Sequence, residues 1–357
     1  MKSRGRWRSR GWKLGVFVAM VLGVRAVLPV VVQRYVNGTL DRIPEFDGRI
    51  GDVDLHLWRG AYEIEDVSLV KTTEAVPVPL FAAPRVDLSI EWGALLRGAL
   101  VGEIVESPEL TFVSAPSTAG TQAGVDASWI DRVEDLFPLK LNRIEVRRGT
   151  IRYRDFHSDP RIDLEMRKVD GVAVNLTNRP SPVERLPASM HATGQPPGGG
   201  TFVFDGRLDP LAEQPTFTMD VSLEGVALRS LNDFLKAYGN LDAEQGTFSA
   251  YAELAAEGGR FEGYVKPLLK DVQVAQWRDN ESLPRRLWEG IVQVAANILE
   301  NPEKERVATR IPLRGRFEDP SPDLWATMAG LLRNAFVQAL LPGIEGSIGL
   351  PSRRRKG

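Results

Sequence analysis

The stretch RVDLSIEW, residues 85–92, decides the fold class of this 357-residue chain. Apolar and polar side chains alternate through it without a break, and Val86, Leu88, Ile90 and Trp92 share one side. Successive side chains of a β-strand point to opposite faces of a sheet, so this pattern predicts a strand with one apolar and one polar face.

The same alternation recurs in short runs that are separated by turn residues. Residues 161–167, 216–223 and 247–254 are the clearest. The last two runs place Phe217, Met219, Val221 and Leu223, and Phe248 and Leu254, on their apolar sides. About fourteen such runs predict a mainly β protein with one long, mainly antiparallel sheet that has a single apolar face.

Helical periodicity is confined to a few segments. Residues 284–299 and 322–341 repeat apolar side chains at the three- and four-residue spacing of an amphipathic helix. The apolar stripe of the second includes Leu324, Trp325, Met328, Leu331, Leu332, Phe336 and Leu340. Two placements stay open for this C-terminal helix: a plug across an open end of the sheet, or a membrane surface. A basic tail, residues 342–357, follows it.

The N-terminus carries a membrane-targeting signal. Residues 1–13 are strongly basic and precede an apolar segment, residues 14–33, whose nineteen residues from Leu14 to Val32 would reach about 28 Å as a helix. The positive-inside rule then predicts a cytoplasmic N-terminus and a single transmembrane helix, with the chain from about Gln33 onward exported. Arg25 and Pro29 weaken the span, and cleavage of a signal peptide after Ala26 is the alternative.

Composition narrows the class of protein further. The chain has no cysteine, which suits an envelope protein that does not depend on disulfides. Positive charge is clustered at the two termini, so residues 14–352 are net acidic and nucleic acid is not an expected partner.

The chain offers little catalytic chemistry. Its three histidines, His56, His157 and His191, stand alone without a second ligand at metal-binding spacing. No HExxH, GxSxG or P-loop motif occurs, and Gly198–Gly200 is better explained as a hairpin connection. We therefore expect no enzyme activity, no metal and no cofactor. An envelope hydrolase would need a nucleophile and base that the sequence does not supply.

Three segments resemble a known family. WRGAYEIEDVSLV (58–70), LNRIEVRRGTIRYRDF (141–156) and the long segment 221–274 are similar to the AsmA-like superfamily of envelope proteins, specifically a branch of unknown function. The resemblance covers most of the chain after the N-terminal segment. It implies an inner-membrane anchor and, over residues 34–321, a curved, taco-shaped periplasmic sheet with an apolar groove. It also implies a role in phospholipid transport toward the outer membrane or in outer-membrane maintenance, and it brings no catalytic residue.

On that resemblance we expect the apolar face to bind phospholipid acyl chains. The expected lining residues are Val86, Leu88, Ile90, Trp92, Phe217, Met219, Val221, Leu223, Phe248 and Leu254. They are assigned from alternation alone, so a β-bulge would reverse the affected run. The alternative is a closed sandwich or barrel core, in which case the protein would be a periplasmic scaffold that binds other envelope proteins.

Overall fold

The computed structural model describes most of the β-rich part of the chain. The described residues are 16, 19, 23, 27–38, 40–41, 45–56, 61–73, 76–89, 99–100, 102–116, 121–122, 140–141, 143–176, 185–210, 212, 214–239, 241–277, 307–308 and 310–316. Within them the chain is mainly β, which confirms the fold class that the alternation predicts.

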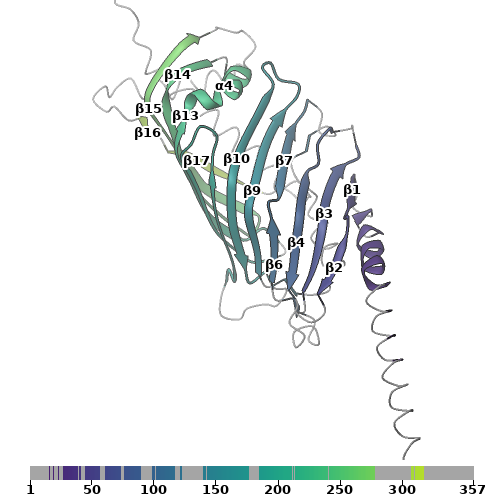
Figure 1. The fold of residues 1–357 in the computed structure, drawn as a ribbon. Coiled ribbons are helices and arrows are strands. Elements are labelled where there is room, and N and C mark those ends of the chain that lie inside the picture. The colour runs from purple at the N-terminus through teal and green to yellow at the C-terminus, as the bar shows by residue number, and fades with distance from the viewer. Residues whose placement is uncertain are drawn as a thin grey trace, which may run out of the picture.

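Fifteen strands form one sheet (Figure 1). They are β1 (Phe46–Arg49), β2 (Val53–His56), β3 (Ala61–Lys71), β4 (Phe81–Ser89), β6 (Gly102–Glu106), β7 (Glu109–Ser114), β9 (Arg143–Asp155), β10 (Ile162–Val174), β11 (Ala188–Gln195), β12 (Thr201–Leu208), β13 (Phe217–Ala227), β14 (Leu241–Glu257), β15 (Arg260–Trp277), β16 (Val307–Ala308) and β17 (Ile311–Arg316). Neighbours are mostly adjacent in sequence and antiparallel. The sheet is nevertheless mixed, because β9 runs parallel to both β6 and β7. A separate parallel pair joins β5 (Ala99–Leu100) to β8 (Lys140–Leu141).

Glycines make the tight connections. Gly258 and Gly259, which join β14 to β15, both have positive φ, as the favoured two-residue hairpin turn requires. Gly198–Gly200, between β11 and β12, have φ values of 75°, 89° and 93°. The hairpin explanation of this triple glycine is therefore correct.

The long strands contain β-bulges, and these bulges preserve the apolar face. On β13 the register shifts between Leu223 and Val226, which pair with Ala250 and Phe248 of β14. Ala250 and Phe248 are two residues apart and share a face, so Leu223 and Val226 also share it although they are three apart. Gly225 lies at this shift and has positive φ, and left-handed residues mark register shifts in other strands: Arg148, Lys168 and Asp271. The bulges thus let most apolar side chains of the long strands stay on one face.

Two short helices cover one end of the apolar face. A 3₁₀ turn, η1 (Leu228–Leu231), leads into α4 (Asn232–Gly239) between β13 and β14. Their buried side chains, among them Phe234, pack in one cluster with Phe248 of β14 and Ile162 of β10. Since β10 and β14 are four positions apart in the sheet, the sheet must bend toward its apolar face for both to reach α4. At the same end, the Tyr238 hydroxyl donates to Asp155 Oδ2 at 2.6 Å.

The N-terminal helix lies against the first edge of the sheet (Figure 1). Residues 27–38 are helical, and Val36 packs against Ile50 and Val53 in a second buried cluster. The Ile50 amide donates to Asn37 Oδ1 at 2.8 Å, and the Gln33 side chain donates to the Gly51 carbonyl. These contacts cover an edge that would otherwise present unpaired backbone groups.

The predicted membrane span falls largely outside the described residues. Val27, Val30 and Val31 of the described helix are apolar and exposed, away from the sheet. Within the described part of the chain, no helix has both the length and the hydropathy that a membrane crossing requires. The transmembrane helix over 14–33 stays a prediction, as do the helices over 284–299 and 322–341 and the basic tail, which lie outside the described residues.

Candidate functional site

One row of cross-strand partners is apolar across nearly the whole width of the sheet. It runs from β2 to β15 through Val53, Ile64, Val86, Val105, Val146, Gly171, Ala192, Phe204, Val221, Ala252 and Val265. Directly opposed residues share a face and lie about 5 Å apart. The row is therefore a continuous hydrocarbon strip, and we call it the apolar row.

A second row on the same face lies two residues closer to the end of the sheet away from α4. Its members are Tyr62, Leu88, Glu103, Ile144, Ala173, Met190, Gly206, Met219, Leu254, Gly263 and Leu313. All are apolar or aromatic except Glu103. The two rows together make an apolar surface several residues deep that holds one ionisable carboxyl.

Burial differs between the flanks and the middle of this surface. On one flank Ile64, Val86 and Leu88 are buried in the cluster that includes Val36 of the N-terminal helix. On the other flank Ala252 and Val265 are buried as well. Between the flanks the side chains are only partly buried. This holds for both rows on β9, β10 and β11, and for the apolar row on β12 and β13. The middle of the apolar row, from β9 to β13, is therefore less buried than its two flanks.

The structure places the predicted lining residues on the apolar face, in three different settings. Val86 and Leu88 lie in the buried first flank, at 5% and 1% exposure. Phe217, Val221 and Leu223 on β13 are partly buried, whereas Met219 and Leu254 are buried together with Phe261. Phe248 is fully buried under η1 and α4. Ile90 and Trp92, like the predicted stripe of the C-terminal helix, lie outside the described residues.

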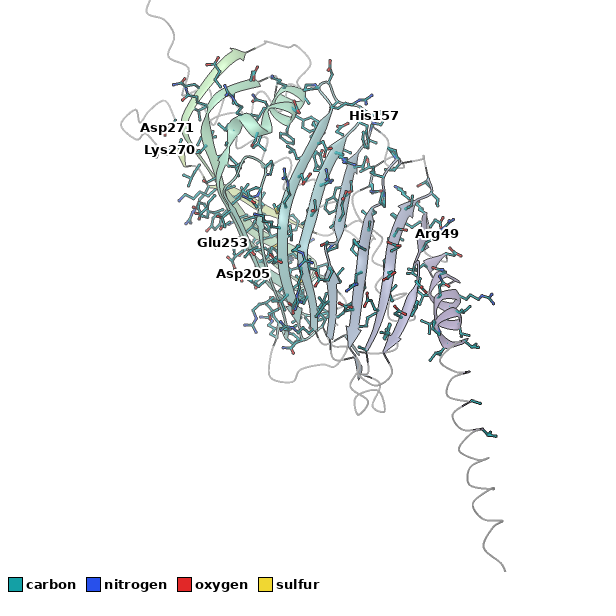
Figure 2. The ribbon with its side chains drawn as sticks, viewed as in Figure 1. Arg49, His157, Asp205, Glu253, Lys270 and Asp271 are labelled. Atoms are coloured by element: carbon teal, nitrogen blue, oxygen red, sulfur yellow. The ribbon has the colours of Figure 1, made fainter. Side chains whose placement is uncertain are left out.

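The opposite face is charged. Arg152 pairs with Glu109 at 3.0 Å and with Glu165 at 2.9 Å across three neighbouring strands. Asp205, Asp220 and Glu253 are cross-strand neighbours on β12, β13 and β14, and Asp205 and Glu253 are labelled in Figure 2. The sheet therefore separates a solvated charged face from an apolar face, as the alternation predicts.

Glu103 was not anticipated from the sequence. It is the second residue of β6, and its neighbours across the sheet are Leu88 on β4 and Ile144 on β9. Burial raises the pKa of the Glu103 carboxyl to about 7. Burial also raises the pKa of Tyr62 on β3, and the negative charge of Glu103 raises it further. Burial is the one cause of the raised pKa of Glu103, and within the described residues no ion pair involves Glu103.

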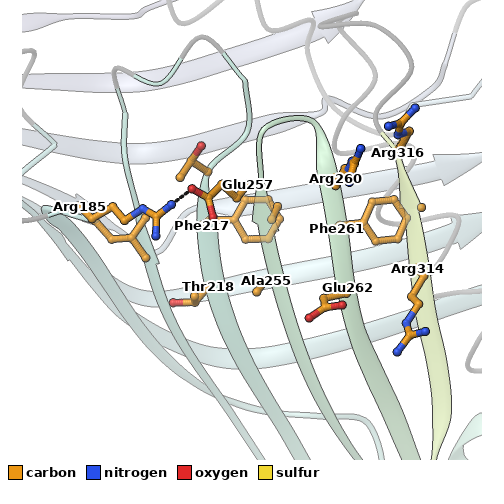
Figure 3. Close-up of a pocket in the computed structure, with 14 residues that line it drawn as sticks. Arg185, Phe217, Thr218, Ala255, Glu257, Arg260, Phe261, Glu262, Arg314 and Arg316 are labelled. Atoms are coloured by element: carbon orange, nitrogen blue, oxygen red, sulfur yellow. Dashed lines mark ion pairs between the residues drawn. The ribbon is translucent and has the colours of Figure 1, made fainter.

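A pocket opens at the ends of β13, β14, β15 and β17 (Figure 3). Its volume is ≈ 1010 Å³, and its lining combines Phe217, Ala256 and Phe261 with four arginines, Arg185, Arg260, Arg314 and Arg316. Arg185 is paired with Glu257. Arg260 and Arg316 are direct cross-strand partners, and Glu257, which is the other cross-strand partner of Arg260, lines the same pocket together with Glu262.

The described residues hold no arrangement suited to metal chemistry. No group of three His, Asp or Glu side chains is placed to hold an ion in the described ranges. His191 Nδ1 lies 2.8 Å from Asp205 Oδ1, but both side chains are exposed on the charged face. The features that could bind a ligand are thus the apolar rows, Glu103 and the arginine-lined pocket.

No family model matches this chain, and no curated protein matches it either. The segments that resemble AsmA-like proteins correspond to β3, to β9, and to the run from β13 through η1 and α4 to β15. They therefore include strands that carry the apolar rows and the helices that cover one end. The AsmA-like assignment rests on this resemblance and stays a prediction.

Proposed function

We propose that this protein binds phospholipid acyl chains on its apolar face and acts in phospholipid transport between the inner and outer membranes of a bacterial envelope, or in outer-membrane maintenance. The single observation that carries the proposal is the apolar row, which is unbroken over the described strands from β2 to β15 and partly exposed from β9 to β13. We infer a non-enzymatic role for it.

The dimensions of the exposed middle fit one lipid chain. Five strand positions, from β9 to β13, span about 19 Å at about 4.8 Å per step. That length is comparable with an extended acyl chain, and each methylene removed from water stabilises a complex by about 0.8 kcal/mol. An acyl chain lying across the strands would contact side chains of the apolar row at every step.

The bend of the sheet supports the taco-shaped groove that the resemblance implies. The apolar faces of β10 and β14 meet on α4, so that face is on the inside of the bend. We infer a groove that α4 closes at one end. Followed backward along the chain, from Asn37 to Val27, the N-terminal helix runs toward the other end of the groove (Figure 1). An inner-membrane anchor would set this end toward the bilayer.

The arginine-lined pocket is a separate site that suits an anionic group. Guanidinium groups bind phosphate through paired, charge-assisted hydrogen bonds. A phosphate bound between Arg260 and Arg316 would lie on the charged face, whereas Phe217 and Phe261 belong to the apolar face at the same strand ends. This pocket lies at the strand ends away from α4 and several strands from β6, so it would be an anion site separate from the apolar groove.

The buried flanks favour a second candidate, a periplasmic scaffold that binds partner proteins. Val86, Leu88, Met219 and Leu254 are as buried as core residues are. If the same cover extended over β9 to β13, the apolar face would be a closed core, and the charged face would make the contacts.

Substituting Val221 by aspartate separates the two candidates. Val221 is partly buried in the middle of the apolar row, so a carboxylate there should repel an acyl chain without unfolding the protein. We expect phospholipid copurifying with the full chain, measured by mass spectrometry of extracted lipid, to fall at least about tenfold. Ser222→Asp, the next residue on the opposite face, is the matched control and should retain lipid. Equal lipid content in wild type and both variants would favour the scaffold.

A further inference from the structure

Glu103 stands where the pattern of the sheet calls for an apolar residue. The other members of its row are apolar or aromatic, and its flanking partners are Leu88 and Ile144. Its own strand has the sequence GEIVE, in which Val105 follows on the same face. A partly buried carboxyl without a cationic partner among the described residues is unfavourable for the free protein, because desolvated charges are normally paired.

The position of Glu103 suggests what would pair with it. Glu103 lies one residue from the start of β6, and that start pairs with the last residue of β4, Ser89, at the end of the sheet away from α4. Tyr62 lies in the same row, one strand beyond Leu88. A carboxylate and a phenol hydroxyl thus lie in one row, two strands apart with Leu88 between them, and the charge of Glu103 raises the pKa of Tyr62. This end of the groove is where the headgroup of a bound lipid would lie.

We propose that Glu103 binds the primary ammonium group of a phospholipid headgroup, with the Tyr62 hydroxyl as a second hydrogen-bond acceptor, so that the groove selects ethanolamine-type lipids. This inference rests on the proposed function and names its substrate class. Three N–H donors of the ammonium satisfy the carboxylate and the hydroxyl. A quaternary choline offers charge without a donor, and a glycerol headgroup leaves the lipid anionic and offers the carboxylate no cation.

The test is a competition among headgroups with identical acyl chains. The full chain, purified in detergent, is incubated with equal amounts of phosphatidylethanolamine, phosphatidylcholine and phosphatidylglycerol, repurified, and its lipid is quantified by mass spectrometry. We expect about fivefold or greater enrichment of the ethanolamine lipid over the glycerol lipid, with the choline lipid between them. Glu103→Gln keeps the shape of the side chain and should bring this ratio close to one at unchanged total lipid.

Asp87→Asn is the matched control, because it removes the same charge from the neighbouring strand on the opposite face. It should retain the wild-type preference. Lipid bound without headgroup preference, or with a preference that Glu103→Gln leaves unchanged, would overturn this inference and leave acyl-chain binding intact. No lipid bound by any of the three proteins would overturn acyl-chain binding itself.

Discussion

Leu88→Asp is expected to lower the free energy of unfolding by about 4 kcal/mol or more, enough to unfold the first flank of the sheet. The Leu88 side chain is 1% exposed and lies in one buried cluster with Val36 of the N-terminal helix. The substitution removes the packing of that side chain and places a carboxylate where neither water nor a cation of the described residues reaches it. Urea denaturation of the full chain in detergent, followed by circular dichroism, measures the loss.

Leu88→Met is the control for this prediction, since a swap that conserves volume in a core usually costs less than about 1.5 kcal/mol. Val221→Asp is the informative contrast, because Val221 lies on the same face but is only partly buried. If Leu88→Asp unfolds at the same urea concentration as the wild type, the prediction is wrong. This flank would then be open, and Val86 and Leu88 would line the groove.

Glu103 is expected to make the stability of the protein fall as the pH rises from about 4.5 to about 8. Its pKa is raised from 4.5 to about 7 in the folded protein. Below pH 4.5 the carboxyl is protonated in both states and contributes no difference. As the pH rises, the unfolded chain releases its proton first, so the folded state is penalised increasingly until the carboxyl ionises there too, above pH 7. Allowing for its partial exposure, we expect a loss of about 1 to 3 kcal/mol.

Glu103→Gln should abolish this contribution, because glutamine does not titrate. The stability of the variant relative to the wild type, that is, the difference between their free energies of unfolding, should therefore increase from pH 4.5 to pH 8. Both proteins are measured in a detergent and a buffer that contain no amines. Among the described neighbours in its row only Tyr62 titrates, well above this range. A difference that stays constant with pH would show that the carboxyl is solvated in the folded protein.

The alternating pattern was sufficient to predict the strands and their apolar side, because both depend on the two-residue period of the backbone. It could not predict which part of that side is covered. Val86 and Leu88 look like groove residues in RVDLSIEW, yet they are buried because Val36, which lies fifty residues earlier in the chain, packs against the same cluster. That cover is a long-range contact, and local periodicity carries no information about it.

The bulges also have a local signal that the alternation alone does not use. Consecutive polar residues, such as Arg147–Arg148, Arg167–Lys168 and Lys270–Asp271, interrupt the pattern where the left-handed residue occurs. Two outward residues in a row let the apolar residues after the bulge return to the same face. Reading such pairs as bulges rather than as strand ends would have joined the short predicted runs into the long strands observed.

Glu103 could not be recognised as a site from its own segment. In GEIVE each face carries one acidic and one aliphatic residue, Glu103 with Val105 and Ile104 with Glu106, so the sequence does not indicate which face is inward. The answer comes from pairing with Leu88 on β4 and with Ile144 on β9, which is a parallel neighbour that local pattern does not predict. The arginine-lined pocket is hidden from the sequence for the same reason, since Arg260 and Arg316 become neighbours only through the register of β15 and β17.

The most direct test of acyl-chain binding is photocrosslinking from two adjacent positions on β12. Phe204 belongs to the apolar row, and Asp205 points to the charged face. Benzoylphenylalanine is incorporated at either position in the full chain, the cells are irradiated, and the purified protein is analysed by mass spectrometry for phospholipid adducts. Binding in the groove predicts an adduct at position 204 and none at position 205. The absence of an adduct at position 204, or equal adducts at both positions, would contradict it.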